Sequence, residues 1–134
     1  MKTLQPLTLD APSATSPSPT GPVKVVTLYG PQTDSAAFER HYAETHVPLA
    51  QQLPGLQRLE TALLLGTAQG GTSPYYRLAD LWFSDIQQLQ AAAASAEGQA
   101  LAADVANFAT GGVTVLVSQV DKPAAATVAG TAVI

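Results

Sequence analysis

A short segment of the chain carries two reactive side chains, an imidazole and a phenol. If the segment is helical, both lie on one face of the helix. The side chains of that face are, in order, Phe38, Tyr42, His46 and Leu49. Spacings of four, four and three residues place them on one side of a helix, and we expect that side to be apolar and directed to the core. An imidazole on such a face either is held in the core by a hydrogen bond or lines a pocket. In a pocket, its ordinary pKa of about 6.5 suits acid–base chemistry.

His46 is therefore the leading catalytic candidate, and two interpretations of it stay open. We favour a pocket acid–base; in the other, the ring bonds a backbone carbonyl and holds the bend expected at Pro48, which has no amide hydrogen. The hydroxyl of Tyr42 could orient a substrate carbonyl, although aromatic packing also accounts for this residue. His41 is adjacent to Tyr42 and points off the apolar face, so we interpret it as a surface residue.

Asp80 is the second candidate, because it lies in an apolar strand. Alternation along residues 75–83 places it on one side with Leu78 and Trp82. A carboxylate is costly to desolvate there, so it needs a partner. It is either an acid–base partner inside a pocket or one end of an ion pair, with Arg58 or Arg77 or across a dimer. Trp82 could be the wall of a pocket for a planar ring, or part of the core or an interface.

Composition narrows the class of protein. The chain has 134 residues, no cysteine and two histidines, so we expect one domain without disulfides or thiolate metal sites, and no metal centre. The formal charge is −4 and the basic residues are scattered, which argues against nucleic-acid binding. The sequence has no apolar run long enough for a transmembrane helix and no signal-peptide pattern. We expect a soluble, cytoplasmic protein that binds no cofactor.

Proline, glycine and periodicity divide the chain into three parts. Residues 1–22, rich in Pro, Ser and Thr, are predicted to be a flexible tail; residues 23–121 form the domain, and residues 122–134 form a second tail. Helices are predicted from about residue 36 to 46, capped by Asp34 or Ser35, and from a capping box at Ser84–Gln87 to about residue 105, interrupted at residues 95–98. The predicted strands are residues 23–29, 56–66, 75–83 and 113–120.

This order, βαββαβ, predicts an α+β domain with the ferredoxin-like arrangement. Its four-stranded antiparallel sheet would carry both helices on one face. The strand at residues 75–83 is apolar on both sides, and a strand of that kind is buried on both sides. Something must therefore cover the open face, and a second copy of the chain is the simplest candidate.

The sequence also resembles a known family. The matching residues are Leu28-Tyr29, the spaced set Phe38, Tyr42, His46, Pro48 and Leu49, then Pro54-Gly55-Leu56, Ala79, Leu81, Phe83-Ser84 and Asn107-Phe108. Together they resemble the EthD family, a branch of the dimeric α+β barrel superfamily, over about residues 23 to 121. The resemblance implies a ferredoxin-like protomer that pairs face to face as a homodimer, a dimeric α/β barrel, with a small-molecule pocket in each half. Relatives in the superfamily include cofactor-free isomerases, cyclases and oxygenases, so the fold alone does not decide the chemistry.

Two functions follow as expectations. The first is a cofactor-independent enzyme of isomerase, cyclase or oxygenase type, in which His46 moves a proton next to the carbonyl of a small apolar compound and Asp80 or Tyr42 steadies the charge. The second is a non-catalytic binding or accessory protein of a degradation or biosynthesis pathway that uses the same pocket. A haem-associated oxygenase is a third, weaker alternative, because only His46 could ligate the iron. The candidate substrate-binding residues are Tyr29, Leu78, Trp82 and Phe108.

Overall fold

The computed structural model of the protein describes residues 21–121, so most of the first predicted tail and all of the second lie outside the described residues. Its elements follow one another as predicted, with short additional helical turns. They are β1 (Val23–Tyr29), α1 (Ser35–His41), the π-turn η2 (Tyr42–His46), α2 (Val47–Gln51), β2 (Arg58–Leu63), β3 (Arg77–Phe83), α3 (Ile86–Ala94), α4 (Ala96–Asp104), the 3₁₀ turn η3 (Val105–Asn107) and β4 (Val113–Gln119).

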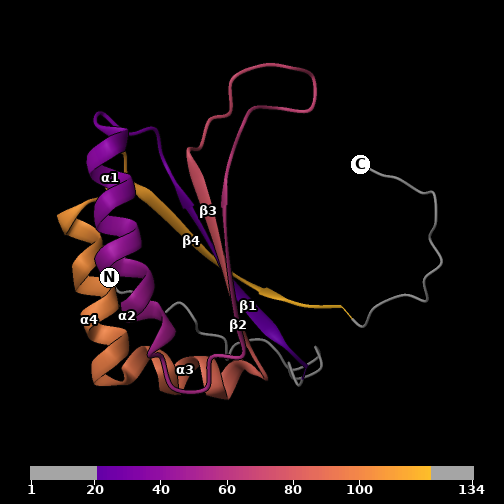
Figure 1. Ribbon diagram of the computed structural model, residues 1–134. Coiled ribbons are helices and arrows are strands. Elements are labelled where there is room, and N and C mark those ends of the chain that lie inside the picture. Colours follow the sequence, from indigo (N-terminus) through magenta and orange to yellow (C-terminus); the bar gives the residue numbers. More distant parts are fainter. Residues whose placement is uncertain (1–20, 122–134) are drawn as a thin grey trace, which may run out of the picture.

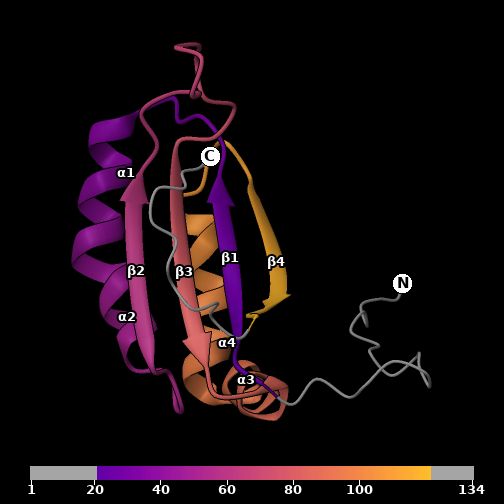
Figure 2. The same ribbon diagram turned by 90° about the vertical axis from the view of Figure 1, so that its right-hand side faces the viewer.

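The four strands form one sheet in the order β2-β3-β1-β4, and every neighbouring pair is antiparallel. The helices lie together on one face of this sheet (Figure 1), and the strand order can be followed across the other face (Figure 2). The strands β1 and β3 are therefore central, β2 and β4 are the edges, and each of the two β–α–β crossovers of the βαββαβ chain passes over one strand. The predicted α+β class and ferredoxin-like arrangement are confirmed.

The core between helices and sheet has an aliphatic end and an aromatic end. The aliphatic cluster is built around Val23, Ala50, Leu53, Ala79, Leu81, Phe83 and Ala92. The aromatic cluster consists of Tyr29, Phe38, Tyr42 and Phe108, with ring centroids 5.1 to 5.9 Å apart in the contacting pairs. Such edge-to-face and offset contacts favour one fixed arrangement of the rings.

The kink or restart predicted at Pro48 takes the form of a π-turn just before it, after which the chain continues as α2. The amide of Val47 donates to the carbonyl of Tyr42, a bond that spans five residues. Pro48 then lies in the first turn of α2, where its missing amide hydrogen costs little. The extra residue shifts the helical face, so that Ala50 is buried and Leu49 is only half-buried.

The alanine-rich segment begins one residue later than predicted. Asp85, not Ser84, is the N-cap of α3, and its side chain accepts a hydrogen bond from the amide of Gln88. The predicted interruption is present, because Ser95 ends α3 and caps α4 by accepting from the amide of Gly98 at 2.9 Å. A Cβ on Gly98 would stand only 2.1 Å from a carbonyl oxygen of α3, so this close turn requires glycine.

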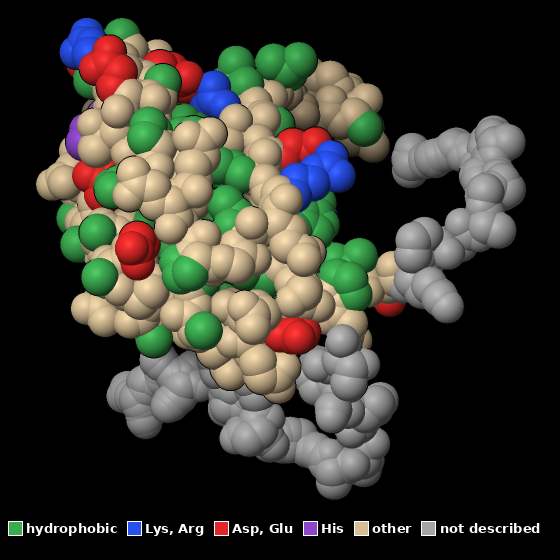
Figure 3. Space-filling view, turned by 60° about the horizontal axis from the view of Figure 1, so that its bottom comes forward, with side chains coloured by type: hydrophobic (Ala, Val, Ile, Leu, Met, Phe, Trp, Pro, Cys, Tyr) green, Lys and Arg blue, Asp and Glu red, His purple; other side chains and the backbone are tan. Residues whose placement is uncertain are grey.

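Within residues 21–121, none of the helices combines the length and the apolar character that crossing a membrane requires. Lys and Arg side chains do not gather into a stripe on the face that Figure 3 displays, where charged groups are spaced apart.

Candidate active site

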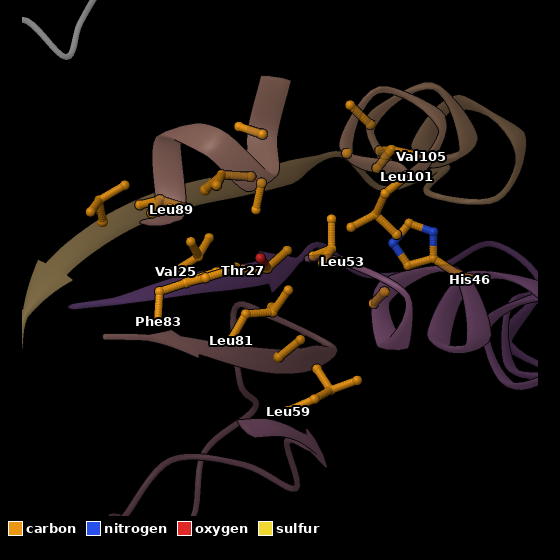
Figure 4. A pocket seen from close by; sticks show the side chains of 18 of the residues that line it. Val25, Thr27, His46, Leu53, Leu59, Leu81, Phe83, Leu89, Leu101 and Val105 are labelled. Carbon is orange, nitrogen blue, oxygen red and sulfur yellow. The ribbon is translucent and has the colours of Figure 1, made fainter. Parts of the chain in front are cut away.

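A cavity of about 630 Å³ lies between the sheet and the helices. Its floor comes from all four strands, and its walls come from η2, α2, α3, α4 and η3 (Figure 4). Nearly all of its lining is aliphatic or aromatic, and the polar side chains among its lining are Thr27, Tyr29, Tyr42, His46 and Gln90. Its size and lining are typical of sites for small apolar molecules.

His46 is the ionisable group with the strongest claim to act in this cavity. Figure 4 shows its ring projecting from the helix toward the sheet, beside Leu101 and Val105. The residue is 6% exposed, so the ring is shielded from bulk water on its other sides. The π-turn that ends at His46 aims the side chain inward. Such turns are often found at functional sites.

Asp104 holds the His46 ring from behind. Its Oδ2 lies 2.8 Å from Nδ1 of His46, and the two side chains are each 7% exposed. Because an ionised carboxylate only accepts, Nδ1 carries the proton and donates it, which leaves the lone pair on Nε2. Within residues 21–121, the His46 ring makes its side-chain hydrogen bond through Nδ1. The neutral ring is therefore set up to accept a proton at Nε2.

The carboxylate of Asp104 has two further donors. Nε2 of His41 lies 2.9 Å from Oδ1 and 3.0 Å from Oδ2, and the amide of Asn107 donates to Oδ1 at 2.9 Å. Burial acts to raise the pKa of Asp104, but the hydrogen bonds from Asn107, His46 and His41 outweigh burial and lower it. The group is thus a stable anion, although it lies at the end of α4, where the helix dipole disfavours negative charge.

Burial lowers the pKa of His46, and the repulsion from His41 adds to this effect, while Asp104 opposes it. At neutral pH the ring is therefore uncharged. An uncharged imidazole with a fixed tautomer is the form that a general base requires.

Two phenols line the same cavity. Burial raises the pKa of Tyr42 to about 12, and burial together with the neighbouring Tyr42 raises the pKa of Tyr29 further. Both hydroxyls keep their protons near neutral pH, so they can donate hydrogen bonds. The ring of Tyr42 also lies 5.8 Å from that of His46 and is nearly parallel to it. The structure thus brings together three of the seven predicted site residues, His46, Tyr42 and Tyr29.

Three predicted site residues lie on the opposite face of the sheet. The register places Leu78, Asp80 and Trp82 on the side that the helices leave open, so Asp80 is not a partner of His46. Asp80 instead pairs with Lys24, whose Nζ lies 3.3 Å from Oδ2. Trp82 has Lys24 and Arg58 near its ring, at 5.0 and 4.7 Å. Asp80 therefore forms an ion pair, as the second interpretation expected, but its partner is Lys24 and not Arg58 or Arg77.

Phe108 and His41 also differ from the prediction. Phe108 does not line the cavity but packs behind it, with its ring centroid 4.6 Å from that of His46 and 5.1 Å from that of His41. His41 is not an ordinary surface residue, because it contacts Asp104 and stacks on Phe108. An ideal α-helix would have pointed it elsewhere, and the π-turn brings it round to the carboxylate.

Asp104 was not found from the sequence, because 58 residues separate it from His46. One local feature could have drawn attention to it. An aspartate in the last turn of an alanine-rich helix opposes the helix dipole, so it needs a compensating partner. Among residues 21–121, no group of three or more His, Cys, Asp and Glu side chains is arranged to hold a metal ion.

A model of the EthD domain matches residues 30–112, which span all the helical segments together with β2 and β3. The chain belongs to the EthD family. An uncharacterised 11.0 kDa protein from the thcB–thcC intergenic region of Rhodococcus erythropolis is 45% identical over 93 residues, 69% of this chain and 89% of that protein. An EthD family protein from Bacillus halodurans C-125 has a similar structure, with a TM-score of 0.71 and 31% identity over 75% of this chain and 99% of that chain.

More distant structures share the fold alone. A hydroxynitrile lyase from Passiflora edulis has a TM-score of 0.64 and 12% identity over 78% of this chain and 98% of its own. SnoaB, a cofactor-independent oxygenase from Streptomyces nogalater, has a TM-score of 0.53 and 18% identity over 81% and 97%. A dimeric ferredoxin-like protein of unknown function from Bacteroides fragilis has a TM-score of 0.56 and 13% identity over 77% and 100%. The fold of this chain therefore also occurs in two enzymes, one of them a cofactor-independent oxygenase, and in a dimeric protein.

Proposed function

We propose that this EthD family protein is a cofactor-independent acid–base enzyme, of isomerase, cyclase or oxygenase type, acting on a small apolar carbonyl compound. One observation carries the proposal: the His46 ring lines an apolar cavity while Asp104 holds its Nδ1 at 2.8 Å. A histidine that served only to fill the core would not need a buried carboxylate beside it. Burying that carboxylate is costly unless it is fully hydrogen-bonded.

The chemical step is the removal of a proton from the carbon next to a carbonyl. The C–H bond breaks, the proton passes to Nε2 of His46, and the electron pair moves to the carbonyl oxygen, which becomes an enolate. Asp104 stabilises the imidazolium that forms, because its negative charge is 2.8 Å from Nδ1. Return of the proton to another carbon would give an isomer, whereas attack by the enolate carbon on a second carbonyl would close a ring.

The phenols of Tyr29 and Tyr42 are the candidate donors to the developing enolate oxygen. Their raised pKa values keep them protonated, and a hydrogen bond in a largely apolar cavity is stronger than one in water. The apolar lining would hold the rest of the substrate. The names of the distant neighbours, a hydroxynitrile lyase and a cofactor-independent oxygenase, support this class of chemistry on the fold without specifying a substrate.

Exchange of the acidic α-hydrogens of β-tetralone tests the proposal. This apolar bicyclic ketone is small enough for a cavity of about 630 Å³. In deuterium oxide, the native protein should catalyse the loss of its α-proton signals. His46→Gln should reduce the rate by at least about 100-fold, the usual contribution of a general base. Asp80→Asn is the matched control, because it changes a buried carboxylate on the opposite face. Equal rates for native protein and His46→Gln would refute the proposal.

A non-catalytic binding protein remains the second candidate, and the lining of the cavity favours it. Few of its side chains are polar, so most of the binding energy for any ligand would come from apolar contact. A binder of this kind would take up β-tetralone with the same affinity in native protein and in His46→Gln, without proton exchange in either.

A second copy of the chain is the proposed cover of the open sheet face. Val26, Leu78, Trp82 and Leu116 all lie on that side in the strand register, and Leu116 is 52% exposed. The dimeric state of the Bacteroides fragilis structure supports this arrangement.

A further inference from the structure

We propose that His41 is a positioning residue that acts on His46 through Asp104 and couples the proton affinity of His46 to the pH of the surrounding water. The inference rests on the proposed role of His46 as a base. It concerns a residue outside the cavity, and it follows from how two histidines share one carboxylate.

The sharing is a consequence of the π-turn. In a regular α-helix, five residues turn the chain through about 500°, which would leave the side chains of residues 41 and 46 about 140° apart. A π-turn bonds residue i to residue i+5 and brings those two positions to the same side. Nε2 of His41 thus reaches Asp104 at 2.9 Å and Nδ1 of His46 reaches it at 2.8 Å.

The two histidines face different surroundings. The side chain of His46 is 7% exposed and lines the apolar cavity, whereas that of His41 is 29% exposed. His41 lies in a separate groove of about 330 Å³ with a largely polar lining, and Phe108 packs against both rings. Since Nε2 of His41 donates to Asp104, its Nδ1 is the atom that accepts a proton from water. His41 can therefore take up a proton without losing its hydrogen bond.

A proton on His41 weakens the stabilisation that Asp104 gives to a protonated His46. The carboxylate then neighbours one full positive charge, and a second imidazolium at His46 is disfavoured by repulsion. When His41 carries a proton, His46 is therefore a weaker base. The other ionisable groups nearby are Asp34, Arg40 and Glu44, which line the groove, and Tyr29 and Tyr42 on the cavity side, with Arg77 over the Tyr42 ring.

Asn107 provides a matched control. Like His41, it donates to Oδ1 of Asp104 at 2.9 Å, but it carries no titrating proton. If both residues only hold the carboxylate in place, replacing either one should have the same effect on His46. If His41 also senses pH, replacing His41 should change the pH response of His46 in a way that replacing Asn107 does not.

Nitrogen-15 NMR of the histidine rings tests the inference, because the sequence contains two histidines and His41→Gln leaves one. In the native protein, neutral His46 should be the Nδ1–H tautomer, and its nitrogen shifts should show a step at the midpoint of His41. In His41→Gln that step should vanish, and the midpoint of His46 should move upward. Asn107→Ala should keep the step. The native spectra alone provide a test that does not depend on either variant folding.

The inference is overturned if the His46 curve has no step at the His41 midpoint, if native protein and His41→Gln give superimposable curves, or if His46 is the Nε2–H tautomer. None of these readouts needs a substrate, so they separate this inference from the proposed function. Proton exchange of β-tetralone without the coupling refutes the role of His41 alone. The coupling without any exchange supports the link between the histidines and refutes the enzymatic proposal.

Discussion

Asp104 and Asp80 are two buried carboxylates on opposite sides of the same sheet, and their surroundings differ sharply. Asp104 is 6% exposed and accepts from His41, His46 and Asn107 through both oxygens. Asp80 is 8% exposed, and its Oδ2 pairs with Lys24 at 3.3 Å. Within the part of the chain that the structure describes, Oδ1 of Asp80 is buried without a partner.

We interpret this difference as one between the proposed site, whose contacts lie within one chain, and the proposed dimer surface, which a second copy would complete. A carboxylate that accepts from three donors through both oxygens is fixed in direction, which is what an acid–base pair requires. A carboxylate with an unpaired oxygen on an open sheet face has capacity left for a further donor. Burial alone therefore does not distinguish the two aspartates, but the number of hydrogen-bond partners does.

Asp104→Asn should have the largest effect. The amide keeps the shape of the side chain but loses the charge that three donors share, which should lower the free energy of unfolding by about 2–3 kcal/mol. The melting temperature should fall by about 10 °C or more. Catalysed exchange of β-tetralone should drop by at least about 100-fold per folded molecule. Thermal melts and exchange rates on the same sample check both effects, and a variant as stable and active as native protein would remove the distinction between the two aspartates.

Leu116→Lys should act on the open face alone. A charge on the open face that the proposed dimer buries is costly to desolvate, so the sedimenting mass should fall from about twice 13.8 kDa toward 13.8 kDa. The ring signals of His46 should stay where they are in native protein, because residue 116 lies on the other side of the sheet. A native protein that already sediments as a monomer at micromolar concentration would contradict the pairing of the open faces.

The melting temperature should decrease as the pH falls from about 7 to about 5. His46 has a lowered pKa in the folded protein, so the unfolded chain binds the proton first, from its ordinary pKa of about 6.5 downward, and stability is lost there. Asp104 also has a lowered pKa, and its contribution is lost at still lower pH as the folded carboxylate takes up a proton. Melts of His46→Gln over the same range should show a flatter profile, and an identical slope would contradict this account.

Asp80→Asn should have the smallest effect. The variant removes one ion pair whose lysine side chain is 30% exposed and can turn to water, so we expect a change of about 1 kcal/mol or less. Proton exchange and the His46 spectrum should be unchanged. If this variant instead impaired exchange as strongly as Asp104→Asn, the two faces would be coupled and the assignment of the site would fail.

The fold could be predicted because its signals are local. Alternating strands, the glycine and proline residues between them, and capping side chains predicted the order of the main elements. Boundaries moved, as at Asp85, and the segment before Pro48 contains a π-turn that was not predicted. The helical spacing also placed Tyr42 and His46 on the buried face. These inferences do not require knowing which segments pack against one another in the core.

The rest of the site depended on features that spacing does not contain. Alternation shows that Asp80 and Trp82 share a face with Leu78, but not which face the helices cover. The partnership of His46 with Asp104 joins segments far apart in the chain. The π-turn changes where His41 points, and its one-residue shift cannot be read from an ideal helical period.

Titration of the native protein with β-naphthol, a planar analogue of the enol of β-tetralone, tests the central claim most directly. The readout is the pair of ring-nitrogen shifts of His46, followed beside those of His41 as an internal reference. We predict saturable binding in which Nε2 of His46 shifts most, Nδ1 keeps its proton toward Asp104, and His46→Gln weakens the binding. Saturable binding that leaves both His46 nitrogens unmoved, or no binding at all, would contradict an acid–base site in this cavity.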